Sequence, residues 1–146
     1  MARVFSLEDG NLNKRSILTA RTISYKDVDL TFAKKPNKDI FKKEDAAAVK
    51  QSVKNIILTN PGEKPFRPFY GAGLTQFLFE NDDGLDVTEI QETVFESISR
   101  DEPRAEVLGV KVITNPDQNS LKVRVAFRVI NTSTVEEISI DLTRLR

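Results

Sequence analysis

The sequence predicts an α+β fold in which two main helices and one short helix pack on an antiparallel β-meander, preceded by an extended N-terminal arm. Two observations predict it. Residues 43–59 and 85–100 repeat apolar residues at helical spacing. Residues 106–144 instead contain three runs that alternate apolar and polar residues, joined by the turn-rich segments "NPDQN" and "NTST".

The composition is that of one soluble domain. The chain has 146 residues, with 22 Lys plus Arg against 22 Asp plus Glu, so its charge favours neither nucleic acid nor an anionic membrane as a partner. Because it has no Cys and no His, thiol nucleophiles, zinc–thiolate sites and histidine bases are excluded. No apolar run is long enough to span a membrane, and the N-terminus lacks the apolar middle of a signal peptide. We therefore expect the chain to stay in the cytoplasm, or in an assembly built there.

Residues 1–26 show no sustained period, and we expect an arm that lies on a partner. Residues 27–146 form the single folded domain. Its first element is a strand over residues 27–32, in which Val28, Leu30 and Phe32 alternate with polar residues to give one buried face.

The first helix is predicted over residues 43–59, with Glu44 and Asp45 in its first turn, where the helix dipole favours negative charge. Pro61 and Gly62 end it. Its core-facing positions are Ala46, Val49, Val53, Ile56 and Ile57.

An aromatic stretch follows, and a short helix is expected over residues 74–80. The chain has nine Phe and two Tyr, and five of these fall between residues 66 and 79. We expect them to plug one end of the core; the alternative is a surface that faces a partner, since aromatic residues are enriched at interface hot spots. The five are Phe66, Phe69, Tyr70, Phe77 and Phe79.

The second main helix, over residues 85–100, begins with a capping-box-like pair, Asp86 and Glu89. Its last turn allows an ion pair between Glu96 and Arg100. Pro103 then stops the helix and biases Glu102 toward an extended conformation. The triplet Glu102, Pro103 and Arg104 is either a helix stop with a surface ion pair or a docking point for another protein.

Three strands are expected over residues 106–114, 120–130 and 135–144, with opposite charges paired across their outward faces. The third strand turns Ile138, Ile140 and Leu142 inward and contains no Pro, Gly or Lys, the residues that usually protect a sheet edge. It is therefore either open to strand addition by a partner or covered by the strand at residues 27–32.

Catalytic and metal-binding machinery is not evident, and we expect no cofactor. The "GAG" at residues 71–73 lacks the Lys-Ser/Thr of a phosphate-binding loop. The acidic segment at residues 80–86 resembles a calcium loop but has Ile90 where an EF-hand needs Glu. Acidic residues could form the carboxylate pair of a glycosidase, but 22 of them make such pairs uninformative.

In order, the segments "DVDLTF", "DAAAVKQSVKNIILTNPGEKPFRPFYGAGL" and "EPR" and a closing β-meander resemble the baseplate wedge and sheath-initiator family of contractile phage tails. A related component occurs in the type VI secretion baseplate. The resemblance covers about residues 27–144, and its most specific parts are residues 58–74 and the triplet 102–104.

The resemblance implies a structural role without enzymatic activity, in the virion tail baseplate close to the tail tube. It implies that Glu102 and Arg104 make charged contacts to a helical core bundle of neighbouring wedge proteins, with Pro103 fixing their separation. It also implies that the strands at 120–130 and 135–144, with Ile138, Ile140 and Leu142, exchange strands with the tail sheath protein and template its first ring. Some family members carry a lysozyme-like label, so a muramidase acting on peptidoglycan is the alternative function.

Overall fold

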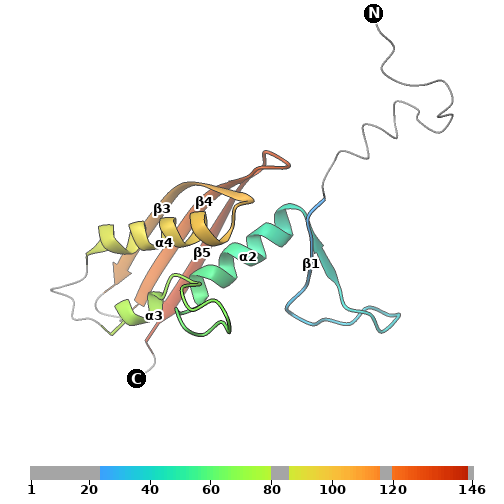
Figure 1. Ribbon diagram of the computed structural model, residues 1–146, viewed down its shortest axis with the longest axis horizontal. Coiled ribbons are helices and arrows are strands. Elements are labelled where there is room, and N and C mark those ends of the chain that lie inside the picture. Colours follow the sequence, from blue (N-terminus) through green and yellow to red (C-terminus); the bar gives the residue numbers. More distant parts are fainter. Residues whose placement is uncertain (1–23, 80–85, 116–119, 145–146) are drawn as a thin grey trace, which may run out of the picture.

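The computed structural model describes residues 24–79, 86–115 and 120–144, and in them it shows the expected α+β fold (Figure 1). Helices α2 and α4 cover one face of a three-stranded sheet, and a separate two-stranded sheet projects from the N-terminal end of α2. Most of the N-terminal arm, expected over residues 1–26, lies outside the described residues. Its last two residues belong to the folded part, because Tyr25 packs against the core and Lys26 begins β1.

The main sheet is the predicted meander. Strands β3 (Ala105–Asn115), β4 (Ser120–Val129) and β5 (Val135–Thr143) are antiparallel and lie in the order β3-β4-β5. Alternate residues of β4 are fully or almost fully buried because one face of the sheet meets the helices. Phe127 is the largest of these and is wholly buried, which contributes about 1.5–3 kcal/mol relative to an exposed side chain.

Opposite charges pair across the outward face of this sheet, one pair between β4 and β5 as predicted and one between β4 and β3. Lys122 Nζ lies 3.3 Å from Asp141 Oδ1 on the neighbouring strand. Arg128 donates from both Nε and Nη2 to Glu106 Oε2. All four side chains are substantially exposed, so each pair contributes at most about 1 kcal/mol.

Helices α2 (Ala46–Leu58) and α4 (Val87–Asp101) are the two main helices that the apolar period predicts. The side chain of Asp86 caps α4 by accepting a hydrogen bond from the backbone N–H of Thr88 at 2.8 Å. The expected Glu96–Arg100 pair is replaced, because Arg100 Nη2 bonds to Asp101 Oδ2 and to the carbonyl oxygen of Phe69. The short helix α3 (Leu74–Phe77) exists but ends earlier than residue 80.

The N-terminus of α2 differs from the prediction. Glu44 is not in its first turn but in strand β2 (Lys42–Glu44), and Asp45 is the residue that precedes the helix. Asp45 has a φ of 46° and is tied to Tyr25 by two hydrogen bonds, from Tyr25 N to Asp45 Oδ1 and from Asp45 N to Tyr25 O. For Glu44, pairing with Lys26 of β1 therefore outweighs the stabilisation that the helix dipole would give it in the first turn of α2.

The strand expected over residues 27–32 is wrong in both length and burial. Strand β1 is only Lys26–Val28, and it pairs with β2 rather than with the main sheet. Val28, Leu30 and Phe32 are 45%, 49% and 61% exposed. The hairpin is attached to α2 by the buried side chain of Gln51, which donates to Val28 O and accepts from Leu30 N.

The aromatic stretch does not plug the core as expected. Of its five aromatic residues only Phe77 is buried and Tyr70 is half-buried. Phe66, Phe69 and Phe79 are exposed. Phe66 and Phe69 belong to a surface loop at residues 60–73, which contains several prolines and glycines, and side chains on such a loop have little core to enter. Phe79 follows the end of α3.

Gly71 is the tightest point of that loop. It has a φ of +101°, and a Cβ atom there would lie 2.3 Å from the carbonyl oxygen of Thr59. Gly62 also has a positive φ, of +89°, but a Cβ there would meet no atom within 4 Å. The two positions share the backbone constraint and differ in the close contact.

Gly71→Ala is therefore expected to destabilise the domain by about 3 kcal/mol or more, since it adds a clash with backbone to the conformational strain. Gly62→Ala is the matched control and should cost only about 1–2 kcal/mol. Urea unfolding of both variants measures the difference. Equal losses would contradict the close approach of Gly71 to Thr59.

Candidate docking site

The junction between α4 and β3 is built around a buried ion pair between Glu102 and Arg104. Arg104 donates from Nε to Glu102 Oε1 and from Nη2 to Glu102 Oε2, both at 2.6 Å. The backbone N–H of Arg104 also donates to Glu102 Oε1, at 3.3 Å. The side chain of Glu102 is 3% exposed and that of Arg104 is 30% exposed, so the pair is not the surface ion pair of a simple helix stop.

Burial alone would raise the pKa of the Glu102 carboxyl, but hydrogen bonds from Arg104 and Ser52 and the charge of Arg104 together lower it. The bonds to Glu102 raise the pKa of Arg104. Both groups are therefore charged at neutral pH, and each is the main partner of the other. Two parallel N–H···O bonds fix the plane of the guanidinium as well as its position.

The backbone around this pair is satisfied by the adjoining elements. Glu102 N bonds to Ile98 O at the end of α4, and Ala105 N bonds to Glu102 O as β3 begins. Ile130 N, at the end of β4, bonds to the carbonyl oxygen of Arg104. The ion pair thus sits where one helix and two strand ends meet.

The outer side of Arg104 faces the N-terminal part of the chain. The Arg104 guanidinium carbon lies 5.3 Å from the centre of the Tyr25 ring, a cation–π distance. Asp27 in β1 is close enough to raise the pKa of Arg104 further. Sequence reasoning missed Tyr25 and Asp27, because no local pattern links them to a residue nearly eighty positions away.

The structure therefore gives the three residues of the triplet different positions. Glu102 is buried and its carboxylate is occupied by Arg104, so it holds Arg104 rather than facing outward. Pro103 is exposed and Arg104 is partly exposed. The parts of the triplet that a partner protein could contact are therefore Pro103 and the guanidinium N–H groups that do not bond to Glu102.

The last turn of α4 also anchors the loop at residues 60–73. Asp101 Oδ2 accepts from Gly71 N, Ser97 Oγ donates to Gly71 O, and Arg100 Nη2 donates to Phe69 O at 2.6 Å. Phe66 and Phe69 nevertheless remain 102% and 79% exposed. The loop is thus firmly held while its two phenylalanines project from the surface, an arrangement that the partner-facing alternative predicts.

The edges of the main sheet differ in their protection. Within the described residues β5 pairs only with β4, and strand β1, which was a candidate to cover it, lies in the other sheet. The opposite edge strand, β3, is interrupted by a β-bulge between Val107 and Gly109 and carries Lys111, two features that hinder pairing with foreign strands. Strand β5 has neither.

The side chains of Ile138 and Ile140 are each 6% exposed and point into the core, and Leu142 packs against the same core from a half-buried position. They are therefore core residues as well as members of the edge strand. An interface at this edge would use the backbone N–H and C=O groups of alternate β5 residues, which point away from β4.

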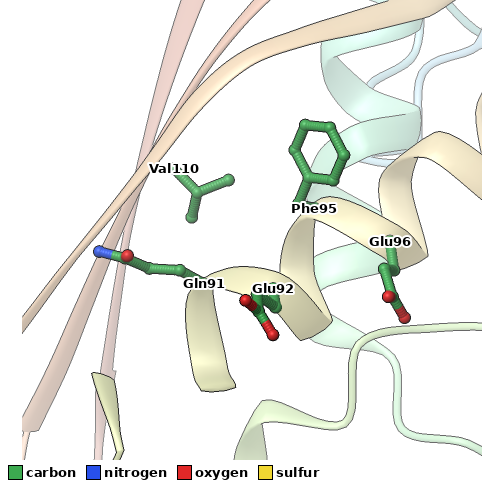
Figure 2. A pocket seen from close by; sticks show the side chains of 5 residues that line it. All are labelled: Gln91, Glu92, Phe95, Glu96 and Val110. Carbon is green, nitrogen blue, oxygen red and sulfur yellow. The ribbon is translucent and has the colours of Figure 1, made fainter. Parts of the chain in front are cut away.

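A shallow pocket of about 520 Å³ lies between α4 and β3 (Figure 2). Phe95 lines it from α4 and Val110 from β3, and the carboxylates of Glu92 and Glu96 point away from the Phe95 ring. Among the described residues no group of three or more Asp or Glu side chains is placed to hold a metal ion; the calcium-loop-like segment falls mostly on residues 80–85, outside them. In the described part of the chain, no helix is long and apolar enough to cross a membrane.

Comparisons with known proteins identify the class of this fold. A structure of the anti-feeding prophage baseplate contains a chain that is 26% identical, with a TM-score of 0.58 over 87% of this chain and 90% of that one. A Geobacter sulfurreducens protein provisionally named a tail lysozyme has a TM-score of 0.58, is 24% identical, and aligns over 67% of this chain and 89% of that one. At that identity the second likeness shows the fold alone. The fold is that of a structural protein of contractile-tail baseplates.

The particular family follows from the sequence. Residues 43–134 match the family of the baseplate wedge protein gp25. Baseplate wedge protein gp25 of Enterobacteria phage T4 is 33% identical over 119 residues, which are 81% of this chain and 90% of that protein. The chain belongs to the gp25 baseplate wedge family, and the expected resemblance is confirmed.

The lowered pKa of Glu102 predicts a pH-dependent stability. The ion pair contributes fully above about pH 4.5, the ordinary value of a Glu carboxyl, and its contribution is lost as the pH falls through the lower pKa of the folded state. Glu102→Gln should cost about 2 kcal/mol at pH 7 and progressively less below pH 4.5. Urea unfolding of both proteins at several pH values measures this.

Glu106→Gln is the matched control, because Glu106 also pairs with an arginine, Arg128, but both side chains are about half exposed. It should cost no more than about 1 kcal/mol. An equal loss in the two variants, or a Glu102→Gln loss that does not change with pH, would contradict the buried pair.

Proposed function

We propose that this chain is a wedge component of a contractile-tail baseplate that docks on the helical core bundle of neighbouring wedge proteins and templates the first ring of tail sheath. Membership of the gp25 baseplate wedge family supports the baseplate role. The observation that carries the templating role is the β5 edge, which has no protecting feature and pairs only with β4 among the described residues, whereas the opposite edge strand, β3, carries a bulge and a lysine.

Strand addition to β5 follows from the chemistry of a sheet edge. Alternate residues of β5 present backbone N–H and C=O groups that have no partner strand within the described part of the chain. A strand from the sheath protein would satisfy them and extend the sheet from three strands to four. Two contacts fix the position of β5. Its inner side chains pack in the core, and Nζ of Lys50 in α2 lies 3.2 Å from Oε2 of Glu136.

Docking on the core bundle is assigned to Arg104 and Pro103. Glu102 and Tyr25 fix the guanidinium before any partner arrives, so little side-chain freedom remains to be lost on binding. Glu102 therefore acts by positioning Arg104, which refines the expectation that both charges reach the partner. Contacts with proteins near the tail tube, and assembly in the host cytoplasm before the virion is complete, belong to the same proposal.

Amide hydrogen exchange tests the templating role. In the isolated chain, the amides of β5 should alternate between protected and rapidly exchanging, because only every second residue bonds to β4. Addition of the cognate sheath protein should protect the rapidly exchanging set. The amides of β3 are the internal control and should not change, because the bulge prevents regular pairing there.

Sheath binding that leaves the β5 amides unchanged would contradict strand addition at this edge. Protection that appears on β3 instead would place the template on the other side of the sheet. Either result would leave the baseplate role itself intact, since that role rests on the family.

We take the role to be non-enzymatic, against the muramidase alternative. A muramidase needs a carboxylic acid that remains protonated near neutral pH. In the described residues, every carboxyl group with a clear pKa shift is shifted downward, namely Asp29, Glu63, Asp86 and Glu102. None of these four carboxyl groups has the raised pKa that a muramidase acid needs.

Purified, folded chain is accordingly expected to release no reducing sugar from peptidoglycan. Hen-type lysozyme serves as the positive control in the same assay. Sugar release that a single carboxylate substitution abolishes, with the fold unchanged, would establish the muramidase instead.

A further inference from the structure

The outward face of the main sheet, on the side that α2 and α4 leave open, is not a uniform polar surface. Two of its rungs are neutralised internally, by the Lys122–Asp141 and Glu106–Arg128 pairs. Between these two rungs lie two others, formed by Gly109 with Ala126 and by Lys111 with Arg124. These two middle rungs have a different character.

The Gly109–Ala126 rung forms the floor of a hollow. Neither residue has a side chain larger than a methyl group, and a hollow of about 310 Å³ lies over them. Leu108, the extra residue at the β-bulge, is 51% exposed beside it. A Cβ added at Gly109 would meet no atom within 4 Å, so the space above this residue is open.

The Lys111–Arg124 rung places two like charges directly opposite each other on adjacent strands, an arrangement that destabilises a sheet. Both side chains line the same hollow and both residues are exposed. Neither belongs to any of the ion pairs formed among the described residues. The rung therefore carries two positive charges that form no ion pair in the described part of the chain. Glu137, which lines the hollow at the Ala126 rung, belongs to none of these ion pairs either.

We propose that this hollow is a docking site for a segment of another protein that carries an apolar side chain and a carboxylate about 7 Å apart, the spacing of two rungs along a strand. The apolar side chain enters over Gly109 and Ala126, against Leu108. The carboxylate lies between Lys111 and Arg124 and removes their mutual repulsion. We name this surface the outer-face hollow.

The lining favours a protein segment over nucleic acid. A nucleic acid backbone needs a row of cations, whereas the neighbouring cations here are already paired with carboxylates. Glu137 lines the hollow at the Ala126 rung and repels phosphate and carboxylate alike from that end. Glu137 thus sets the orientation of the bound segment, because it keeps the carboxylate of that segment at the Lys111 end of the hollow.

This inference does not depend on the proposed function. The outer-face hollow is on a face of the sheet, whereas the sheath template is its β5 edge and the Glu102–Arg104 pair lies at the α4–β3 junction. Loss of one of these contacts leaves the others testable.

The test uses two substitutions that should weaken binding without lowering the stability of the chain. Lys111→Glu replaces the like-charge rung with an attractive one, so it should raise the urea midpoint of the isolated chain. It should lower affinity for the occupant at least about tenfold, because a carboxylate now meets a carboxylate. Gly109→Val should leave the midpoint near its original value, since its side chain enters open space, and it should weaken binding by filling the hollow.

The probe is an array of short synthetic peptides in which Leu or Phe is separated from Asp or Glu by one to three residues, with Lys in place of the acid in matched controls. Binding to the full-length chain is measured by fluorescence anisotropy. We expect selection of acidic over basic peptides, and loss of that selection in Lys111→Glu and Gly109→Val. Lys54→Glu, an equal change of charge on the exposed side of α2, should bind as the original chain does.

Three results would overturn the proposal. One is equal binding of acidic and basic peptides. Another is unchanged acidic-peptide binding by both Lys111→Glu and Gly109→Val. The third is stronger binding of a DNA oligonucleotide that competes with the acidic peptides, which would assign the cations to phosphate.

Discussion

The rest of the structure depends on the buried ion pair between Glu102 and Arg104. A carboxylate with a 3% exposed side chain is tolerated there because the guanidinium and backbone N–H of Arg104 and the side chain of Ser52 all donate hydrogen bonds to it. The Glu102–Arg104 pair fixes the junction at which α4 ends and β3 begins. Its neighbour Asp101 holds the loop at residues 60–73 through Gly71, so one turn of one helix sets the position of the sheet, the loop and the exposed guanidinium together.

The molecule combines a closed core with surfaces that its own described residues do not complete. The inner face of the sheet is buried along β4 and partly buried at Val110 of β3, whereas the β5 edge, the phenylalanines at 66 and 69 and the cations of the outer-face hollow are exposed. Protection is selective, because the β3 edge carries a bulge and a lysine that β5 lacks. This contrast is typical of a scaffold that must pair on one side and avoid pairing on the other. A rigid body with incomplete surfaces binds its neighbours in one geometry, which a baseplate requires of each wedge component.

The spacing of apolar residues along short segments was enough to predict the elements whose formation depends on neighbouring residues. The three strands of the meander, the two main helices and the Asp86 cap all follow from patterns within about ten residues, and the structure has them. The errors lie where distant residues decide. Glu44 joins a strand because β1 pairs with β2, and Val28, Leu30 and Phe32 are exposed because that hairpin stays apart from the main sheet. The triplet at 102–104 could be singled out from its Pro and charges, but burial of Glu102 depends on Ser52 and the core, and the Tyr25 contact spans nearly the whole domain. Neither the burial of Glu102 nor the contact between Tyr25 and Arg104 produces a pattern among neighbouring residues of the sequence.

A cryo-electron microscopy map of the assembled tail base, at a resolution that shows side chains, tests the central claim most directly. The claim is that a buried carboxylate holds Arg104 in place for a neighbouring protein. The account predicts that Arg104 keeps both bonds to Glu102 in the assembly and that its outer N–H groups, with Pro103, contact helices of the wedge core. An Arg104 that has left Glu102 to pair with a partner, or one that faces solvent in the finished baseplate, would contradict it.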